Sequence, residues 1–249
     1  MGYWPVVKKV VKDSDIILLI GDARLPEISQ NKELEEMVSK YGKKLVLAFT
    51  KIDLVSEKYL DFIKEKYKDK EALFVSGTQN IGIAKLKEVL IITGKRMGIK
   101  EPKIGVVGYP NVGKSAVINA LAKRASAKVA SYAGTTRGIQ WIRAGSLLVL
   151  DSPGVVPFED NEAILGVLGA KNPEKLRNVE KVGLEIVKMF FNYDKRILEE
   201  LYEIRIEDPD NALEEIGRKK GLLLKGGIAD EKRAAMQILR DWQKGRLRF

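Results

Sequence analysis

The stretch GYPNVGKS at residues 108–115 decides the fold class of this chain. It fits the pattern G-x-x-x-x-G-K-[ST] and lies between an expected strand at 103–108 and an expected helix at 114–123. Glycines let backbone N–H groups turn inward around phosphate oxygens, and a helix N-terminus adds positive potential. A chance Gly/Pro turn is the alternative, and the strand–loop–helix context disfavours it. The stretch therefore predicts a phosphate-binding loop.

The loop assigns roles to its residues. Lys114 is expected to reach the β- and γ-phosphates, and Ser115 is expected to give a hydroxyl to Mg²⁺. The rest of the expected phosphate-binding set is Asn111, Val112, Gly113 and Ala116.

The segment LLVLDSPG at 147–154 places a carboxylate at the end of another apolar strand. We expect Asp151 to hold Mg²⁺ through water, and the amide of Gly154 to sense the γ-phosphate. Between the two motifs lies AGTTRG at 133–138, where Thr136 is the expected third magnesium ligand. Asp-Ser-Pro-Gly is also an ordinary strand-ending turn, but here it follows a phosphate loop. Lys114, Thr136 and Gly154 form the expected catalytic group.

A candidate guanine reader, TKID, occupies residues 50–53. Asp53 can accept from N1–H and the exocyclic amine of guanine, whereas adenine offers no matching donors, and the aliphatic stem of Lys51 can lie over the ring. Thr50 stands where asparagine is more usual; it can still tie loops together, although we expect the change to weaken the site. In VSGTQN at 75–80, the backbone amides of Ser76 and Gly77 are expected to donate to the guanine carbonyl. Each motif alone also reads as a simple turn.

The order of these motifs is reversed, because Asp53 precedes the phosphate loop by 108 − 53 = 55 residues. Read cyclically from residue 103, the order becomes phosphate loop, threonine segment, Asp-x-x-Gly, reader and Ser-Gly, as in an ordinary GTP-binding domain. DIILLIGD at 15–22 supplies the apolar strand that such a sheet needs between the Asp-x-x-Gly motif and the guanine reader. The chain is therefore predicted to be a circular permutation, which changes only the connections between elements.

The fold class expected is α/β: a P-loop NTPase with a doubly wound, mostly parallel sheet in permuted order, followed by a small all-helical domain. Strands are expected at 15–22, 44–50, 72–76 and 103–108, with an antiparallel pair within 138–151. Helices are expected at 3–12 (amphipathic), 31–42, 56–68 and 82–92, and only helices after residue 160. We expect domains at 1–172 and 173–249.

Composition narrows the class of protein. The 249 residues include no cysteine and no histidine, which excludes disulfides, thiolate zinc sites and imidazole bases. No apolar run reaches the 18 residues of a membrane span, and residues 1–15 lack a secretion signal. We therefore expect a cytoplasmic monomer without membrane attachment.

Positive charge is concentrated near the end of the chain. The net charge is +10, and residues 218–249 hold ten Lys/Arg against three carboxylates, 10 − 3 = +7. This balance favours a polyanion, and Trp242 and Phe249 would suit stacking on RNA bases. The alternative is a solvated helix face with both aromatics in the core.

The combined motifs resemble the circularly permuted ribosome-assembly GTPases of the YlqF/YawG type. The resemblance rests on DARLPEISQN (22–31), TKID, VSGTQNIG, GYPNVGKSAVINAL, AGTTRG and LDSPG, and it covers about residues 3–170. It implies GTP and GDP binding, slow hydrolysis, and work on large ribosomal subunit assembly through rRNA or a precursor particle. It also implies that the helical domain contacts ribosomal RNA.

Hydrolysis should depart from the common pattern, because Val155 follows Gly154 where many GTPases carry a water-orienting glutamine. We expect slow turnover, raised by a partner or by K⁺. The resemblance points to Asn111 as a K⁺ ligand, while a purely structural role for Asn111 stays open. The functional alternative is a nucleotide-dependent switch whose helical domain docks on a protein partner.

Overall fold

The computed structural model describes residues 4–123, 141–156 and 162–249. The chain divides into two compact units, residues 1–158 and residues 159–249. The sequence placed the boundary at 172, whereas α6 (Glu162–Val167) packs on α7 (Val179–Asp194) within the second unit. Among the described residues, no helix is both long enough and apolar enough to cross a membrane.

A six-stranded sheet forms the first unit, in the order β3-β2-β1-β4-β6-β5. All neighbouring pairs are parallel except β5 and β6, which are antiparallel. The strands are β1 (Ile16–Asp22), β2 (Lys44–Thr50), β3 (Leu73–Phe74), β4 (Lys103–Gly108), β5 (Trp141–Ala144) and β6 (Leu147–Asp151). The mostly parallel, permuted sheet expected from the sequence is confirmed.

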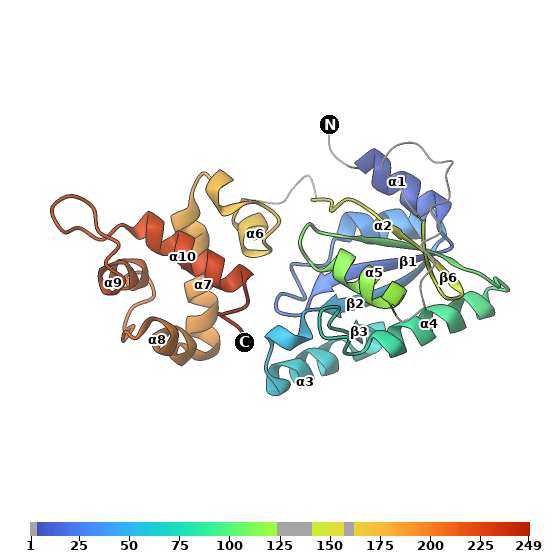
Figure 1. The fold of residues 1–249 in the computed structure, drawn as a ribbon, viewed down its shortest axis with the longest axis horizontal. Helices are drawn as coiled ribbons and strands as arrows, with labels where there is room; N and C mark the ends of the chain where they lie inside the picture. The colour runs from blue at the N-terminus through green and yellow to red at the C-terminus, as the bar shows by residue number, and fades with distance from the viewer. Residues whose placement is uncertain (1–3, 124–140, 157–161) are drawn as a thin grey trace. The chain divides into compact units, whose positions relative to one another are not determined.

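Helices cover both faces of this sheet (Figure 1). The first-unit helices are α1 (Trp4–Asp13), α2 (Lys32–Lys40), α3 (Glu57–Lys66), α4 (Ile83–Arg96) and α5 (Lys114–Lys123), with short 3₁₀ turns η1 (Ile52–Leu54) and η2 (Lys68–Lys70). Side chains from α1, α2 and α3 share one buried cluster with Ile17, Leu19 and Phe49. α4 and α5 pack against each other elsewhere on the sheet. β1 is buried along its whole length, as a central parallel strand requires.

Local sequence explains where several helices begin. Asn31 and Ser56 are N-caps whose side chains accept from the backbone N–H of Leu34 and Tyr59. α1 buries Val7, Val10 and Val11, which share one face at helical spacing.

The second unit contains helices around an aromatic core. After α6 and α7 come α8 (Arg196–Tyr202), α9 (Ala212–Lys219) and α10 (Glu231–Gln243), with a 3₁₀ turn η3 (Pro173–Lys175). α7 and α10 approach closely, because a Cβ on Gly183 would lie 2.7 Å from the Cβ of Ala235. The described part of this unit contains no strand, only an isolated bridge between Leu223 and Ala229.

The aromatic residues near the end of the chain belong to this core. Trp242 and Phe249 are buried, and their rings contact each other and the ring of Phe190. The indole N–H of Trp242 donates to the carbonyl of Val167 (2.7 Å). The expected role of Trp242 and Phe249 as stacking platforms for RNA is therefore wrong, since buried rings that pack against other rings leave no open face for a base.

Candidate nucleotide-binding site

The loop at 108–115 connects β4 to α5 at the carboxyl edge of the sheet. Gly108 and Gly113 have φ of 149° and 105°, and Asn111 adopts φ 59°. A Cβ on Gly108 would lie 2.4 Å from the carbonyl oxygen of Ile20, so only glycine lets the loop pass this close to β1. The strand–loop–helix context expected for phosphate binding is present.

Lys114 folds back over this loop. Its Nζ donates to the carbonyl oxygens of Tyr109 (2.7 Å) and Gly108 (3.2 Å). Burial lowers the pKa of Lys114 to about 8, and the nearby charge of Asp151 acts in the opposite direction. An ammonium group held in a buried position by carbonyl oxygens alone would gain from a polyphosphate, which restores the preference for the charged form.

A hydroxyl and a carboxylate meet where Mg²⁺ was expected. Ser115 Oγ donates to Asp151 Oδ2 (3.0 Å). Asp151 Oδ1 is buried and has no hydrogen-bond partner among the described residues. A buried carboxylate oxygen without a donor, beside a hydroxyl at a helix start, fits the oxygen ligands that Mg²⁺ prefers. Thr136, the expected third ligand, lies outside the described residues.

The segment after Asp151 packs on the phosphate loop. A Cβ on Gly154 would lie 2.5 Å from the backbone of Pro110, and the N–H of Val155 donates to the carbonyl of Gly108 (3.2 Å). The side chain of Val155 is buried in the core cluster. The backbone of Gly154 therefore lies where it can follow a change in the phosphate loop, while the side chain of Val155 offers no polar group there.

The first helix of the chain reaches the same segment. The indole N–H of Trp4 donates to the carbonyl of Val156 (3.3 Å), and Trp4 packs against the core cluster that includes Val155. This contact joins α1 to the residues that follow Gly154.

Thr50 joins the candidate guanine reader to the phosphate loop. Its hydroxyl lies within hydrogen-bond distance of the carbonyl of Gly21 (3.2 Å) and of the carbonyl of Val112, across 62 residues of sequence. A Cβ on Gly113 would lie 2.9 Å from Thr50 Oγ1. Threonine therefore holds the loops together at the position where asparagine is more usual.

Asp53 follows Thr50 in the short turn η1. Its Oδ1 is buried and lacks a hydrogen-bond partner among the described residues. Leaving a buried carboxylate oxygen without a donor is costly, so the site fits a ligand that supplies N–H groups. The N1–H and exocyclic amine of guanine are such donors.

The Ser-Gly loop meets the start of α5. A Cβ on Gly77 would lie 2.6 Å from the carbonyl carbon of Ala116. The loop is closed by reciprocal backbone hydrogen bonds between Ser76 and Ile81, and Ser76 Oγ accepts from the N–H of Gln79 (3.1 Å). Because the amide of Ser76 already donates to Ile81, its expected role as a donor to guanine is wrong. That the amide of Gly77 donates to the guanine carbonyl stays a prediction.

The sequence reasoning assigned no role to two residues at this edge, Asp22 and Arg24. Asp22 lies opposite Thr50 in the β1–β2 register and is fully buried. It accepts from the buried guanidinium of Arg24 (2.8 Å) and from Lys51 Nζ (2.7 Å). The sequence feature that could have pointed to them is the motif DAR at 22–24, in which two charged residues directly follow a fully apolar strand.

These charges shift each other's ionisation. Burial alone would raise the pKa of Asp22, yet Arg24 and Lys51 together hold that pKa well below its ordinary value. Burial lowers the pKa of Lys51, and Asp22 opposes that shift. Asp22 therefore holds Lys51, whose backbone has φ 62°, at the start of the reader turn.

Comparisons with known proteins agree with this geometry. The model of the RsgA GTPase family matches residues 6–160, more than half of the chain, and that of the 50S ribosome-binding GTPase family matches residues 103–222. A GTP-binding protein of Methanocaldococcus jannaschii is 38% identical over 246 residues, 98% of this chain and 65% of the relative. The nuclear GTP-binding protein NUG1 of Saccharomyces cerevisiae is 31% identical over 286 residues, 99% of this chain and 55% of the relative. The chain spans less than two thirds of the length of these relatives.

Solved structures share the fold. YlqF from T. maritima with GNP bound gives a TM-score of 0.64 at 21% identity, covering 98% of this chain and 94% of that chain. The GDP-bound form gives 0.61 at 22% identity, covering 98% and 96%. The family model that covers more than half of the chain shows that this chain belongs to the RsgA GTPase family, and its permuted motif order and fold fit the circularly permuted GTPases of the YlqF type.

Proposed function

We propose that this protein binds GTP and GDP in the site described above and hydrolyses GTP slowly. One observation carries the proposal: the reader and the phosphate loop, far apart in sequence, are joined by Thr50 and Val112, and Asp53 Oδ1 is buried beside them with no donor among the described residues. A guanine nucleotide would supply donors to Asp53 and phosphate oxygens to the loop at once.

Each group then has one task. Asp53 accepts from the base, Gly77 N–H donates to the guanine carbonyl, and Lys51 covers the ring with its stem. The amides of 111–116 and the ammonium of Lys114 hold the phosphates. Ser115, Asp151 through water, and Thr136 would hold Mg²⁺, which when bound neutralises charge on the β- and γ-phosphate oxygens.

Slow hydrolysis follows from what stands after Gly154. Val155 is buried and offers no hydrogen bond to orient an attacking water. The amide of Gly154 can still respond to the γ-phosphate through its contact with Pro110. A partner, or K⁺ bound near the exposed Asn111, would orient the attacking water instead. Turnover measured in KCl and in NaCl tests the cation, and equal rates would contradict it.

Work on the large ribosomal subunit is the second part of the proposal. It is supported by the description of one matching family as 50S ribosome-binding GTPases and by relatives named as nuclear or nucleolar GTP-binding proteins. The basic residues 218–249 suit rRNA or a precursor particle, in the cytoplasm expected from the sequence.

A protein-docking switch is the second candidate function. It is favoured by one observation, that both aromatic side chains expected to stack on RNA are buried in the helical core. Salt-dependent binding to ribosomal RNA would support the first candidate, and salt-insensitive binding to a protein would support the second.

Co-sedimentation with isolated large subunits and their precursors tests the ribosomal role. The full chain is incubated with particles in GDP, in a GTP analogue and without nucleotide. We expect the GTP analogue to give the strongest association. Association that is absent in all three conditions would contradict the ribosomal part while leaving nucleotide binding untouched.

A further inference from the structure

A small hairpin projects between α9 and α10, at residues 222–230 (Figure 1). Its arms are joined at the base by Asp230 N–H donating to Leu222 O (2.7 Å), and further out by Leu224 N–H donating to Ile228 O (2.8 Å). Gly226 and Gly227, with φ of 84° and 76°, make the turn. Asp230 also caps α10 by accepting from the N–H of Arg233. The hairpin is therefore closed by backbone hydrogen bonds at its base, where it joins α10.

The tip of this hairpin is apolar and exposed. Leu223, Leu224 and Ile228 have 44%, 55% and 63% of their surface exposed. No other stretch of six residues in the described part of the chain holds three exposed large hydrophobic side chains. Single exposed apolar residues are ordinary, but a cluster of them on a projecting hairpin indicates a surface that a partner covers.

Basic residues flank this apolar tip in the sequence. Lys225 lies in the turn, Lys220 precedes the first arm, and Lys232 and Arg233 follow the second. Among the ion pairs of the described residues, none involves these four side chains. The two other cations nearby, Arg218 and Lys219, already pair with Glu214 and Glu203. The partner that fits is therefore a polyanion with several spaced negative charges, and it also has apolar surfaces.

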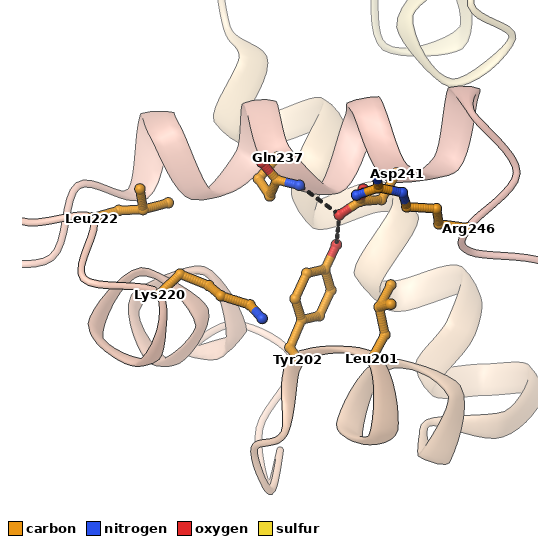
Figure 2. Close-up of a pocket in the computed structure, with 7 residues that line it drawn as sticks. All are labelled: Leu201, Tyr202, Lys220, Leu222, Gln237, Asp241 and Arg246. Carbon is orange, nitrogen blue, oxygen red and sulfur yellow. Dashed lines mark hydrogen bonds and ion pairs between the residues drawn. The ribbon is translucent and has the colours of Figure 1, made fainter.

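A pocket of about 340 Å³ opens at the foot of the hairpin, lined by Lys220, Leu222, Leu201, Tyr202, Gln237, Asp241 and Arg246 (Figure 2). Its one carboxylate is engaged, since Asp241 accepts from Tyr202 (3.0 Å), Gln237 (2.8 Å) and Arg246 (3.2 Å). Lys220 lies over the Tyr202 ring, 5.8 Å from its centroid. The pocket thus combines aliphatic walls with cationic groups at a size suited to a small ligand.

We propose that the hairpin and this pocket form one RNA-binding element for unpaired nucleotides. The aliphatic tip packs against exposed bases, the lysines contact phosphates, and the pocket receives a base that has left the stack. RNA with unpaired bases carries a regularly spaced negative charge on its phosphates and exposes the flat apolar faces of its bases. In a duplex those faces are stacked and hidden. The proposal rests on the proposed binding of ribosomal RNA and names the surface that performs it.

The test uses the full chain and protein-free RNA from large ribosomal subunits. The tip variant, Leu224→Ser with Ile228→Ser, changes only exposed side chains, and Ile92→Ser with Met97→Ser is the matched control on exposed apolar residues of the first unit. We expect the tip variant to bind RNA about tenfold more weakly, because two apolar side chains no longer pack against bases, and with the same salt dependence. The control variant should bind as the parent does, and all three proteins should bind GDP equally.

Charge is tested separately with Lys220→Ala and Lys225→Ala together. Loss of two phosphate contacts should reduce the slope of log affinity against log salt by about 1.4. Single-stranded RNA should compete with the ribosomal RNA, and duplex RNA should not.

Three outcomes would overturn the inference. Undiminished RNA binding by the tip variant would remove the hairpin from the RNA interface while leaving the ribosomal role in place. Binding of a ribosomal protein, lost in the tip variant without RNA present, would assign the surface to a protein. Failure of the parent chain to bind ribosomal RNA would contradict the proposed function itself.

Discussion

Gly77 rests against the backbone of Ala116: a Cβ on Gly77 would lie 2.6 Å from the Ala116 carbonyl carbon. The loop after β3 is therefore in direct contact with the first turn of α5. In an ordinary chain order the Ser-Gly loop comes last and the helix after the phosphate loop comes first, and here that order is reversed. Contact between them is what a single nucleotide site requires after permutation.

Replacing Gly77 by alanine should weaken nucleotide binding. The added methyl group must displace backbone, which costs about 1–3 kcal/mol and moves the Ser-Gly loop away from the base. We expect GDP affinity to fall about tenfold or more in fluorescence titrations. Gln79→Ala, in the same loop with an exposed side chain, is the control. Equal affinities for the two variants would show that the close packing has no role in binding.

Replacing Asp53 by asparagine should change base selectivity. An amide can accept one donor but cannot accept from both N–H groups of guanine, and each lost charge-assisted bond is worth about 1.5–3 kcal/mol. Xanthine carries a carbonyl in place of the exocyclic amine, and the asparagine N–H₂ can donate to it. GDP affinity should fall about a hundredfold while affinity for xanthosine diphosphate rises.

Competition titrations with both nucleotides measure this exchange. Asp61→Asn, an exposed carboxylate on α3, should change neither affinity. A uniform loss for both nucleotides in Asp53→Asn would mean that Asp53 supports the fold instead of reading the base.

Replacing Asp22 by asparagine should affect both stability and binding. It leaves Arg24 and Lys51 without their buried counter-ion, a change that costs about 3–5 kcal/mol. Because Lys51 is then no longer held, GDP should also bind more weakly. In a double-mutant cycle with Lys51→Met, the effects on GDP affinity should not add, since both changes remove the same contact. Additive effects would separate Asp22 from the base site.

The same pair predicts a pH dependence. The pKa of Asp22 is lowered in the folded state from its ordinary value of 3.8, so the folded chain releases this proton more readily than the unfolded chain does. The stability from Asp22 is therefore present above pH 3.8 and is lost as the pH falls below it. Urea unfolding from about pH 5 down to about pH 2 should show the stability difference between the parent and Asp22→Asn shrinking. A constant difference would contradict the ionised pair.

Trp4 should report the state of the nucleotide. Its indole donates to Val156 O, and the adjacent Val155 N–H donates to Gly108 O in the phosphate loop. Loss of the γ-phosphate should shift this segment and change tryptophan emission between a GTP analogue and GDP. The change should disappear in Trp4→Phe. An unaltered signal in that variant would place the sensing elsewhere.

Sequence reasoning worked best where local signals were strong. The strands at 44–50 and 103–108 and the helix at 114–123 lie where apolar runs and the Gly-Lys-Ser motif place them. The permutation could also be inferred, because it depends only on the order of motifs. β3 proved shorter than the expected 72–76, since Ser76 leaves the sheet to pair with Ile81.

Features that depend on packing could not be found this way. The pairing of Asp22 with Lys51 requires the register of β1 against β2, which no local pattern specifies. Trp242 and Phe249 have the composition of an RNA-binding tail, yet the helices enclose them, because burying large aromatic surface outweighs any gain from exposure. The first unit ends before α6 for a similar reason, since α6 packs on α7.

Calorimetric titration of the purified chain with GDP, with ADP as the comparison, tests the central claim most directly. If the reader and the phosphate loop form one site, each chain binds one GDP. ADP then binds at least about a hundredfold more weakly, because adenine has no donors at the positions where guanine presents N1–H and its amine to Asp53. Equal affinity for GDP and ADP, or no heat with either, would contradict the convergence of the two segments on a guanine nucleotide.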